Sequence, residues 1–222
     1  MAKINVLLTT ANGNLVDKKK VIEAAVLQAQ DYAFPRLHIE WDIDVLVTNR
    51  IPLLIPENGV GGYTFSSDFI RINIDDKKVT KELIAENIVH ELCHAARWGK
   101  NAEWMNSLFD NLIFEGIACC LEVEYLRSAN SKSIFIRTIL ERTDEENEII
   151  LKELRRQLDS SGYDYDTVFF NGDDRIPQWA GYSLGYYLVK KYLDKTGKKI
   201  EEAFADKYGD FKTCLLDGDI KY

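Results

Sequence analysis

The sequence predicts an α+β fold, in which a small N-terminal β-sheet leads into a motif-bearing helix and then a mainly helical C-terminal lobe. Two observations predict this order. Segments rich in β-branched and alternating residues fall in the first third of the chain, at 37–48, 61–65 and 69–75. From about residue 80 onward, apolar residues recur at helical spacing instead. The length of 222 residues and the hydrophobic content of 46% are typical of a globular protein with a sizeable core.

The individual elements follow from periodicity and from turn residues. Residues 17–34 have an apolar helical face, and residues 37–48 form the first expected strand. Pro52, Pro56 and Asn58 mark a loop before the next two strands. The chain has no internal repeat. The remaining helices are expected at 80–98, 103–127, 131–141, 145–158, 178–194 and 198–207.

The helix expected at 80–98 has clear start and stop signals. It follows a polar turn, with Thr80 as the expected N-cap and Gly99 as the expected C-cap. Ile88 and Leu92 belong to an apolar stripe that faces the core. Polar residues beside that stripe are therefore expected at the floor of a cleft.

The most informative motif lies in this helix, where residues 90–94 read His-Glu-Leu-Cys-His. Helical spacing of four residues places His90 and His94 on one face, where both imidazoles can bind one metal ion. Zinc favours imidazole nitrogen, so we expect about one Zn²⁺ per chain, with Glu91 as the general base. The alternative is a helix with two exposed or hydrogen-bonded histidines and an ordinary surface glutamate.

A zinc ion held by two histidines needs a third protein ligand. The extended motif with a third histidine is absent, because Arg97 and Lys100 stand where its glycine and histidine would be. The remaining histidine, His38, lies far upstream on an expected strand. A site with two histidines and a glutamate is the natural solution. We expect Glu115 as this ligand, because a carboxylate in so apolar a stretch is costly to bury without a cation.

Other roles for the acidic residues stay open. Glu115 could instead be an exposed residue of an amphipathic helix. The competing carboxylates are Glu103, Glu122 and Glu124. Because Glu122 lies two turns beyond Glu115 on the same helix face, it could orient a histidine rather than bind the metal.

Composition limits the partners and the compartment. A net charge of −8 argues against nucleic acid, which requires a basic surface. No apolar stretch approaches the length of a membrane span, and the N-terminus lacks a secretory apolar region, so we expect a cytoplasmic protein without a membrane partner. Cys93, Cys119 and Cys120 lie in apolar helical segments and are expected to be reduced core residues. Cys93 could alternatively approach the metal, because it lies near His90 in the helix.

Three blocks of this sequence together resemble the YjaZ-like bacterial proteins, which are predicted zinc-dependent proteases. The blocks are residues 90–94, 115–118 and 179–189, and the resemblance covers about residues 60–195. It implies gluzincin-like chemistry, with His90, His94 and Glu115 as zinc ligands and Glu91 as the catalytic acid–base. With the length of the chain, we expect a single zincin-like metallopeptidase domain over 1–222, with the sheet and active-site helix in about 1–100 and the helical lobe in about 101–222.

Thermolysin-like enzymes carry a further donor to the oxyanion, usually a histidine or a tyrosine. Because no histidine remains here except His38, a tyrosine or an arginine must serve. Tyr182 is our candidate, with Tyr186 and Arg175 as alternatives. Gly181 and Gly185 suggest a competing interpretation, in which this block is a small-residue helix face that packs tightly.

The predicted activity is hydrolysis of a peptide bond by a metal-activated water. An exposed strand edge, at 61–65 or 69–75, would bind an extended peptide or protein substrate through its backbone. Two alternatives remain. The chain could be a non-catalytic zinc-binding protein whose fourth metal position is closed, for example by Cys93. It could also be a metal-dependent hydrolase of a non-peptide amide.

Overall fold

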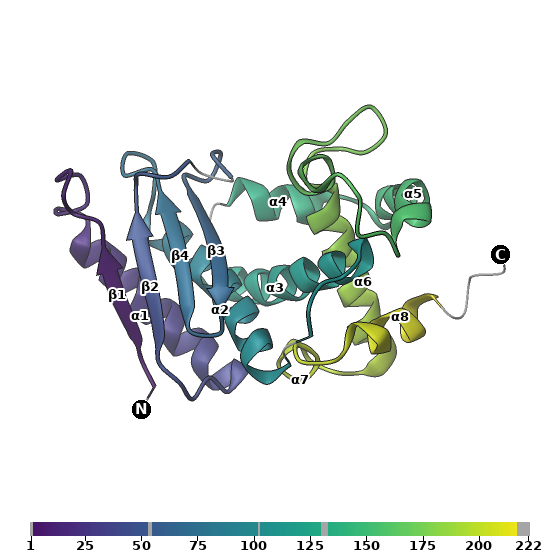
Figure 1. The fold of residues 1–222 in the computed structure, drawn as a ribbon, viewed down its shortest axis with the longest axis horizontal. Coiled ribbons are helices and arrows are strands. Elements are labelled where there is room, and N and C mark those ends of the chain that lie inside the picture. Colours follow the sequence, from purple (N-terminus) through teal and green to yellow (C-terminus); the bar gives the residue numbers. More distant parts are fainter. Residues whose placement is uncertain (1, 53–54, 102, 130–132, 217–222) are drawn as a thin grey trace. The chain divides into compact units, whose positions relative to one another are not determined.

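A computed structural model describes residues 2–52, 55–101, 103–129 and 133–216 of the chain (Figure 1). The chain forms two compact units. The first contains Met1–Lys100 and Leu121–Phe135, and the second contains Asn101–Cys120 and Ile136–Tyr222. Two helices, α3 (Leu108–Ala129) and α4 (Ile134–Glu141), pass from one unit to the other. The predicted α+β class is confirmed, with a small sheet near the N-terminus followed by helices.

The sheet of the first unit has four strands in the order β1-β2-β4-β3 (Figure 1). Strand β2 pairs in parallel with both β1 and β4, whereas β3 pairs antiparallel with β4. The strands expected at 61–65 and 69–75 are therefore confirmed, and β3 rather than β4 lies at the edge. The strand bounds are β1 (Ile4–Leu8), β2 (Ile43–Thr48), β3 (Val60–Ser66) and β4 (Phe69–Ile74).

The first helix ends later than expected, and the strand that follows it begins later and is shorter than expected. Helix α1 (Lys19–Leu37) continues through Pro35, and β2 begins only at Ile43. His38 ends the helix in the left-handed region at φ 50°, while the backbone N–H of Ile39 donates to the carbonyl of Phe34 at 3.1 Å. The expectation that His38 lies on a strand was therefore wrong. Strand β1 was not predicted, because its partner β2 lies about 39 residues further along the chain.

Helix α2 (Lys81–Lys100) carries the motif and packs against β3 and β4. Figure 1 shows α1 and α2 behind the sheet. Thr80 caps α2 as predicted, since its hydroxyl accepts the backbone N–H of Leu83 at 3.3 Å. Gly99 lies inside the last turn instead of ending the helix. A Cβ atom at Gly99 would lie 2.4 Å from the ring of Trp41, so close packing explains this glycine.

The second unit is helical in the part that the structure describes, and its first helix begins later than expected. Ser107 and Asp110 cap each other at the start of α3: the Ser107 hydroxyl accepts the Asp110 N–H at 3.2 Å, and the Asp110 carboxylate accepts the Ser107 N–H at 3.1 Å. The helix therefore begins at Leu108 rather than near residue 103. The other elements are α5 (Asp144–Leu154), η1 (Arg155–Gln157), η2 (Thr167–Asn171), α6 (Ala180–Thr196), α7 (Ile200–Ala203) and α8 (Tyr208–Leu216).

Helices α3 and α6 approach each other closely within the second unit. A Cβ atom at Gly116 would lie 2.2 Å from the carbonyl oxygen of Gly185, and one at Gly185 would lie 2.2 Å from that of Leu112. Both positions therefore require glycine. Across the described ranges, no helix combines the length and the apolar character needed to cross a membrane.

Candidate metal centre

Helix α2 places three buried polar residues of the motif next to one another. His90, Glu91 and His94 are 7%, 5% and 5% exposed. As the spacing predicted, the two histidines lie one turn apart, with their Nε2 atoms 3.1 Å from each other. Their ring planes are nearly perpendicular, at 84°. Two imidazole nitrogens thus converge on one point inside the first unit.

This separation suits a shared metal ion. Two nitrogens bound to one tetrahedral zinc at about 2.0–2.1 Å lie about 3.3–3.4 Å apart, close to the distance found between His90 and His94. The imidazoles therefore need to move only slightly to bind the same ion.

Glu122 orients one of these histidines. It lies in the part of α3 that belongs to the first unit, and its Oε2 atom is 2.7 Å from Nδ1 of His90. A buried carboxylate at this distance accepts the proton on Nδ1, which leaves the lone pair of Nε2 available for a metal. The contact matches the second of the two roles considered for Glu122, that of a partner of a histidine.

The two competing carboxylates, Glu103 and Glu124, have other partners. Glu124 is 40% exposed and forms an ion pair with Arg36 at 3.7 Å. Glu103 belongs to the second unit, where its carboxylate accepts the backbone N–H of Tyr208 at 2.8 Å. Each of these carboxylates therefore has a structural partner of its own within its unit.

Glu91 is held against the sheet rather than exposed. The hydroxyl of Thr64 on β3 donates to its Oε2 atom at 2.7 Å and lies 3.0 Å from its carbonyl oxygen. A Cβ atom at Gly62 would lie 2.4 Å from Cγ and from Oε1 of Glu91. Thr64 and Gly62 thus fix the position of this carboxylate, and both were missed as site residues because the contacts join elements 27 and 29 residues apart in sequence.

Glu115 lies on the half of α3 that belongs to the second unit and is 8% exposed. Within that unit it lies near Tyr163, whose side chain forms a hydrogen bond with Asn111. Burial, and then the negative charge of Glu115, raise the pKa of the Tyr163 hydroxyl. Tyr163 was not singled out in the sequence, because only a long-range contact brings it to α3.

Tyr182 and its two alternatives lie in the second unit. Tyr182, on α6, is 7% exposed, and its ring packs edge-on against Phe169 at a centroid distance of 5.3 Å. The guanidinium of Arg175 is exposed and pairs with Asp173 at 2.7 Å. The backbone carbonyl of Tyr186 accepts a weak hydrogen bond from the thiol of Cys120 at 3.9 Å. The aromatic packing of Tyr182 and the close approach at Gly185 agree with the tight-packing interpretation of this block, and the catalytic role of Tyr182 stays a prediction.

Comparison with known families decides the relationship of this chain. A family described as predicted Zn-dependent protease (DUF2268) matches residues 22–213. The chain belongs to this family. The match confirms the resemblance to YjaZ-like zinc proteases and extends it to most of the chain. Comparisons with curated proteins and with solved structures gave no match.

The residues of this DUF2268 chain fit the metal in the family description. The predicted donors are the imidazoles of His90 and His94 in the first unit and the carboxylate of Glu115 in the part of α3 that belongs to the second unit. Zinc sites in hydrolases use this combination of donors and keep a fourth position for water or substrate. The hydrogen bond from His90 to Glu122 adds the carboxylate partner that zinc-binding histidines commonly have.

Proposed function

We propose that this chain is a zinc-dependent metallopeptidase that hydrolyses peptide bonds through a metal-activated water. The observation that carries the proposal is a buried chain of side-chain contacts, from Glu122 to His90 and from His90 to His94. It brings the Nε2 atoms of the two imidazoles to 3.1 Å from each other, next to a glutamate held by the sheet. Such an arrangement stabilises a bound cation and places a base beside it.

In this proposal His90, His94 and Glu115 hold one zinc ion. Glu115 precedes Glu122 by seven residues, which is about two turns of the uninterrupted helix α3. Both carboxylates therefore lie on the same helix face, and Glu122 on that face reaches His90. Glu115 is buried, as expected of a carboxylate that binds a cation.

Zinc bound by these residues would lower the pKa of a water molecule and polarise the substrate carbonyl. Glu91 accepts the proton of the attacking water and returns it to the departing amine. The hydrogen bond from Thr64 and the backbone of Gly62 keep its carboxylate in place during both transfers. Glu91 is thus the general base and then the general acid of the reaction.

A tyrosine hydroxyl would stabilise the oxyanion that forms on the carbonyl. Tyr182 is our first candidate, as the sequence suggested. Tyr163 is the second, because it lies beside Glu115 within the second unit. Replacement of each by phenylalanine separates them, since loss of the true donor lowers kcat about 100-fold or more and loss of the other tyrosine leaves kcat unchanged.

The proposed substrate is an extended peptide or protein segment, and we propose the cytoplasm as the place of action. Strand β3, which carries Gly62 and Thr64, lies at the edge of the sheet. An added peptide strand could form backbone hydrogen bonds there, next to Glu91. Cys93, Cys119 and Cys120 are buried in α2 and α3, as expected of core thiols of a protein in a reducing compartment.

The test combines metal content with hydrolysis of a peptide library by the full chain. Wild type should hold about one zinc ion per chain and cleave peptides. Glu91→Gln should keep zinc and lose hydrolysis, whereas Glu115→Ala should lose zinc affinity. Full zinc retention in Glu115→Ala would remove this residue from the ligands. Zinc without any hydrolysis in wild type would favour a non-catalytic zinc protein.

A further inference from the structure

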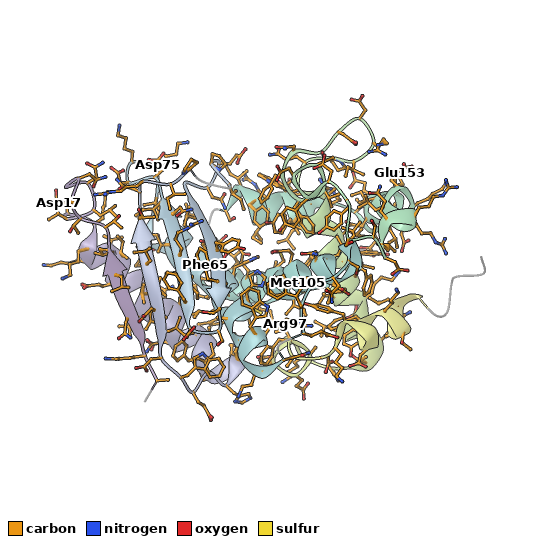
Figure 2. The ribbon with its side chains drawn as sticks, viewed as in Figure 1. Asp17, Phe65, Asp75, Arg97, Met105 and Glu153 are labelled. Atoms are coloured by element: carbon orange, nitrogen blue, oxygen red, sulfur yellow. The ribbon has the colours of Figure 1, made fainter. Side chains whose placement is uncertain are left out.

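Strand β3 presents different residues to its two sides. Gly62 and Thr64 face helix α2, because both contact Glu91. Successive side chains of a strand point to opposite faces, so Tyr63 and Phe65 lie on the other face of the sheet. They are 49% and 46% exposed, and Figure 2 labels Phe65 on this strand. The edge strand that borders Glu91 therefore exposes two aromatic rings on its outer face.

These rings form one cluster, which we call the aromatic platform and define as Tyr63, Phe65, Phe69 and Arg71. The ring centroids of Tyr63 and Phe65 are 4.7 Å apart, and Phe65 stacks on Phe69 at 5.2 Å. The Arg71 guanidinium lies 5.2 Å from the centroid of Phe65 and 5.9 Å from that of Tyr63. The platform is thus an ordered apolar surface with one positive charge beside it.

The positive charge of Arg71 lies on the side of the platform that is further from the sheet edge. Arg71 is the direct partner of Tyr63 in the register of β4 and β3, so it lies one strand further from the edge. Its Nε atom is buried and has no hydrogen-bond partner in the described part of the chain. The cation is therefore engaged with the two rings, which leave their outward sides to a ligand.

A peptide bound along β3 would bring its side chains to this platform. Among the described residues only β4 pairs with β3, so the outer edge of β3 can accept a further strand. Directly opposite residues of paired strands have Cβ atoms about 4.5–5.5 Å apart. Glu91 contacts Gly62 and Thr64 on β3. The substrate carbonyl that is attacked must therefore lie near residues 62–64. The peptide residues opposite Tyr63 and Phe65 then lie within about two residues of the scissile bond.

We propose that the aromatic platform is a specificity-determining subsite that selects peptides with a large apolar side chain, and rejects lysine and arginine, next to the scissile bond. This inference rests on the proposed peptidase function. An apolar or aromatic side chain gains contact with both rings, and offset aromatic pairs add to this attraction. A second cation gains little, because Arg71 already occupies the rings and repels it.

The test uses the full zinc-loaded chain and a series of otherwise identical peptides in which one residue beside the scissile bond is Phe, Leu or Lys. Wild type should cleave the Phe and Leu peptides with a KM about tenfold lower than that for the Lys peptide. Tyr63→Ala and Phe65→Ala should raise KM for the Phe peptide by about tenfold and leave kcat unchanged, because the platform binds ground state and transition state alike.

Leu7→Ala is the matched control. Leu7 lies in the same row across the sheet as Tyr63, through Leu46 and Arg71, and is 47% exposed, but it stands on the opposite edge strand. Its replacement should change neither KM nor kcat. Equal KM values for Phe and Lys peptides in wild type, or unchanged KM in both platform variants, would overturn the proposal.

A binding measurement separates this inference from the proposed function. Fluorescence anisotropy of the labelled Phe and Lys peptides with the Glu91→Gln protein reports binding without turnover. The Glu91→Gln protein should bind the Phe peptide more tightly than the Lys peptide. If adding Tyr63→Ala to Glu91→Gln removes this difference, the platform is supported, even where wild type cleaves no peptide. Hydrolysis by wild type together with equal binding of both peptides would retain the peptidase and discard the platform.

Discussion

Gly62 on strand β3 lies so close to Glu91 on helix α2 that a Cβ atom at Gly62 would be 2.4 Å from the Cγ and Oε1 atoms of that glutamate. The backbone of the edge strand therefore rests directly on the carboxylate proposed as the general base. No flexible side chain separates them, so the position of β3 and the position of this carboxylate depend on each other.

Gly62→Ala should consequently impair the reaction while sparing the metal. The added methyl group must displace Glu91 or β3, at a cost of about 1–3 kcal/mol in unfolding free energy and at least about tenfold in kcat. Zinc content, measured by elemental analysis, should stay at the wild-type level. Gly209→Ala is the control, because a Cβ atom there meets nothing within 4 Å. Wild-type kcat in Gly62→Ala would show that the carboxylate moves without consequence.

Thr64→Val should also disturb the position of Glu91, because it removes a hydrogen bond to the Glu91 carboxylate. Valine keeps the shape of threonine but removes the hydroxyl that donates to Oε2 of Glu91 at 2.7 Å. Loss of one hydrogen bond to a buried carboxylate costs about 1–3 kcal/mol, and we expect kcat to fall with it. Thr64→Ser restores a hydroxyl and should recover most of the rate in a steady-state assay. A serine variant as slow as the valine variant would point to packing instead.

Glu122→Gln should lower zinc affinity about 10- to 100-fold, because the neutral amide supports the Nδ1 proton of His90 less well than a carboxylate does. Competition with a zinc-binding dye measures this change. Glu124→Gln, two residues away on the same helix, removes an equal charge that pairs with Arg36. It should leave zinc affinity unaltered, and equal losses in the two variants would mean that only net charge matters.

The second unit contains an acid-sensitive contact. The Tyr187 hydroxyl donates to Glu148, and this hydrogen bond, together with Lys191, holds the pKa of Glu148 below its ordinary value of 4.5. A lowered pKa stabilises the folded state above pH 4.5, and this stabilisation is lost as the pH falls further. Tyr187→Phe should therefore reduce the unfolding free energy at neutral pH by less than about 1 kcal/mol, since the side chain of Glu148 is half-exposed. Urea unfolding at neutral pH and at about pH 3 should show the difference shrinking in acid.

The parts of the fold that depend on local signals could be predicted. Thr80 caps α2 as its position suggested, and the strands expected at 61–65 and 69–75 are β3 and β4. The errors occur where a distant contact outweighs a local signal. Gly99 stays within α2 because Trp41 packs on it, and β1 becomes a strand only through its pairing with β2. Helix α1 ends two residues after Pro35, which cannot donate a backbone N–H to the preceding turn.

The site divides in the same way. Helical spacing alone placed His90 one turn from His94, since both lie on one element. The contact between Glu122 and His90 was one of two interpretations, because helix register gave the face but not the neighbouring helix. The contacts of Thr64 and Gly62 with Glu91 depend on how the sheet lies on α2, which no short sequence pattern encodes. Tyr163 was not predicted as a site residue, because only a long-range contact brings it near Glu115.

Because α3 is one uninterrupted helix, few insertions or deletions can be tolerated within it. Glu115 and Glu122 share a face only because seven residues separate them on one helix. Insertion or deletion of a single residue between them would turn one carboxylate by about 100° around the helix axis relative to the other. Substitutions between these two positions can be absorbed one at a time, whereas a change of length cannot. We therefore expect natural variation in length to accumulate in exposed loops such as 10–14 and to spare the segment 115–122.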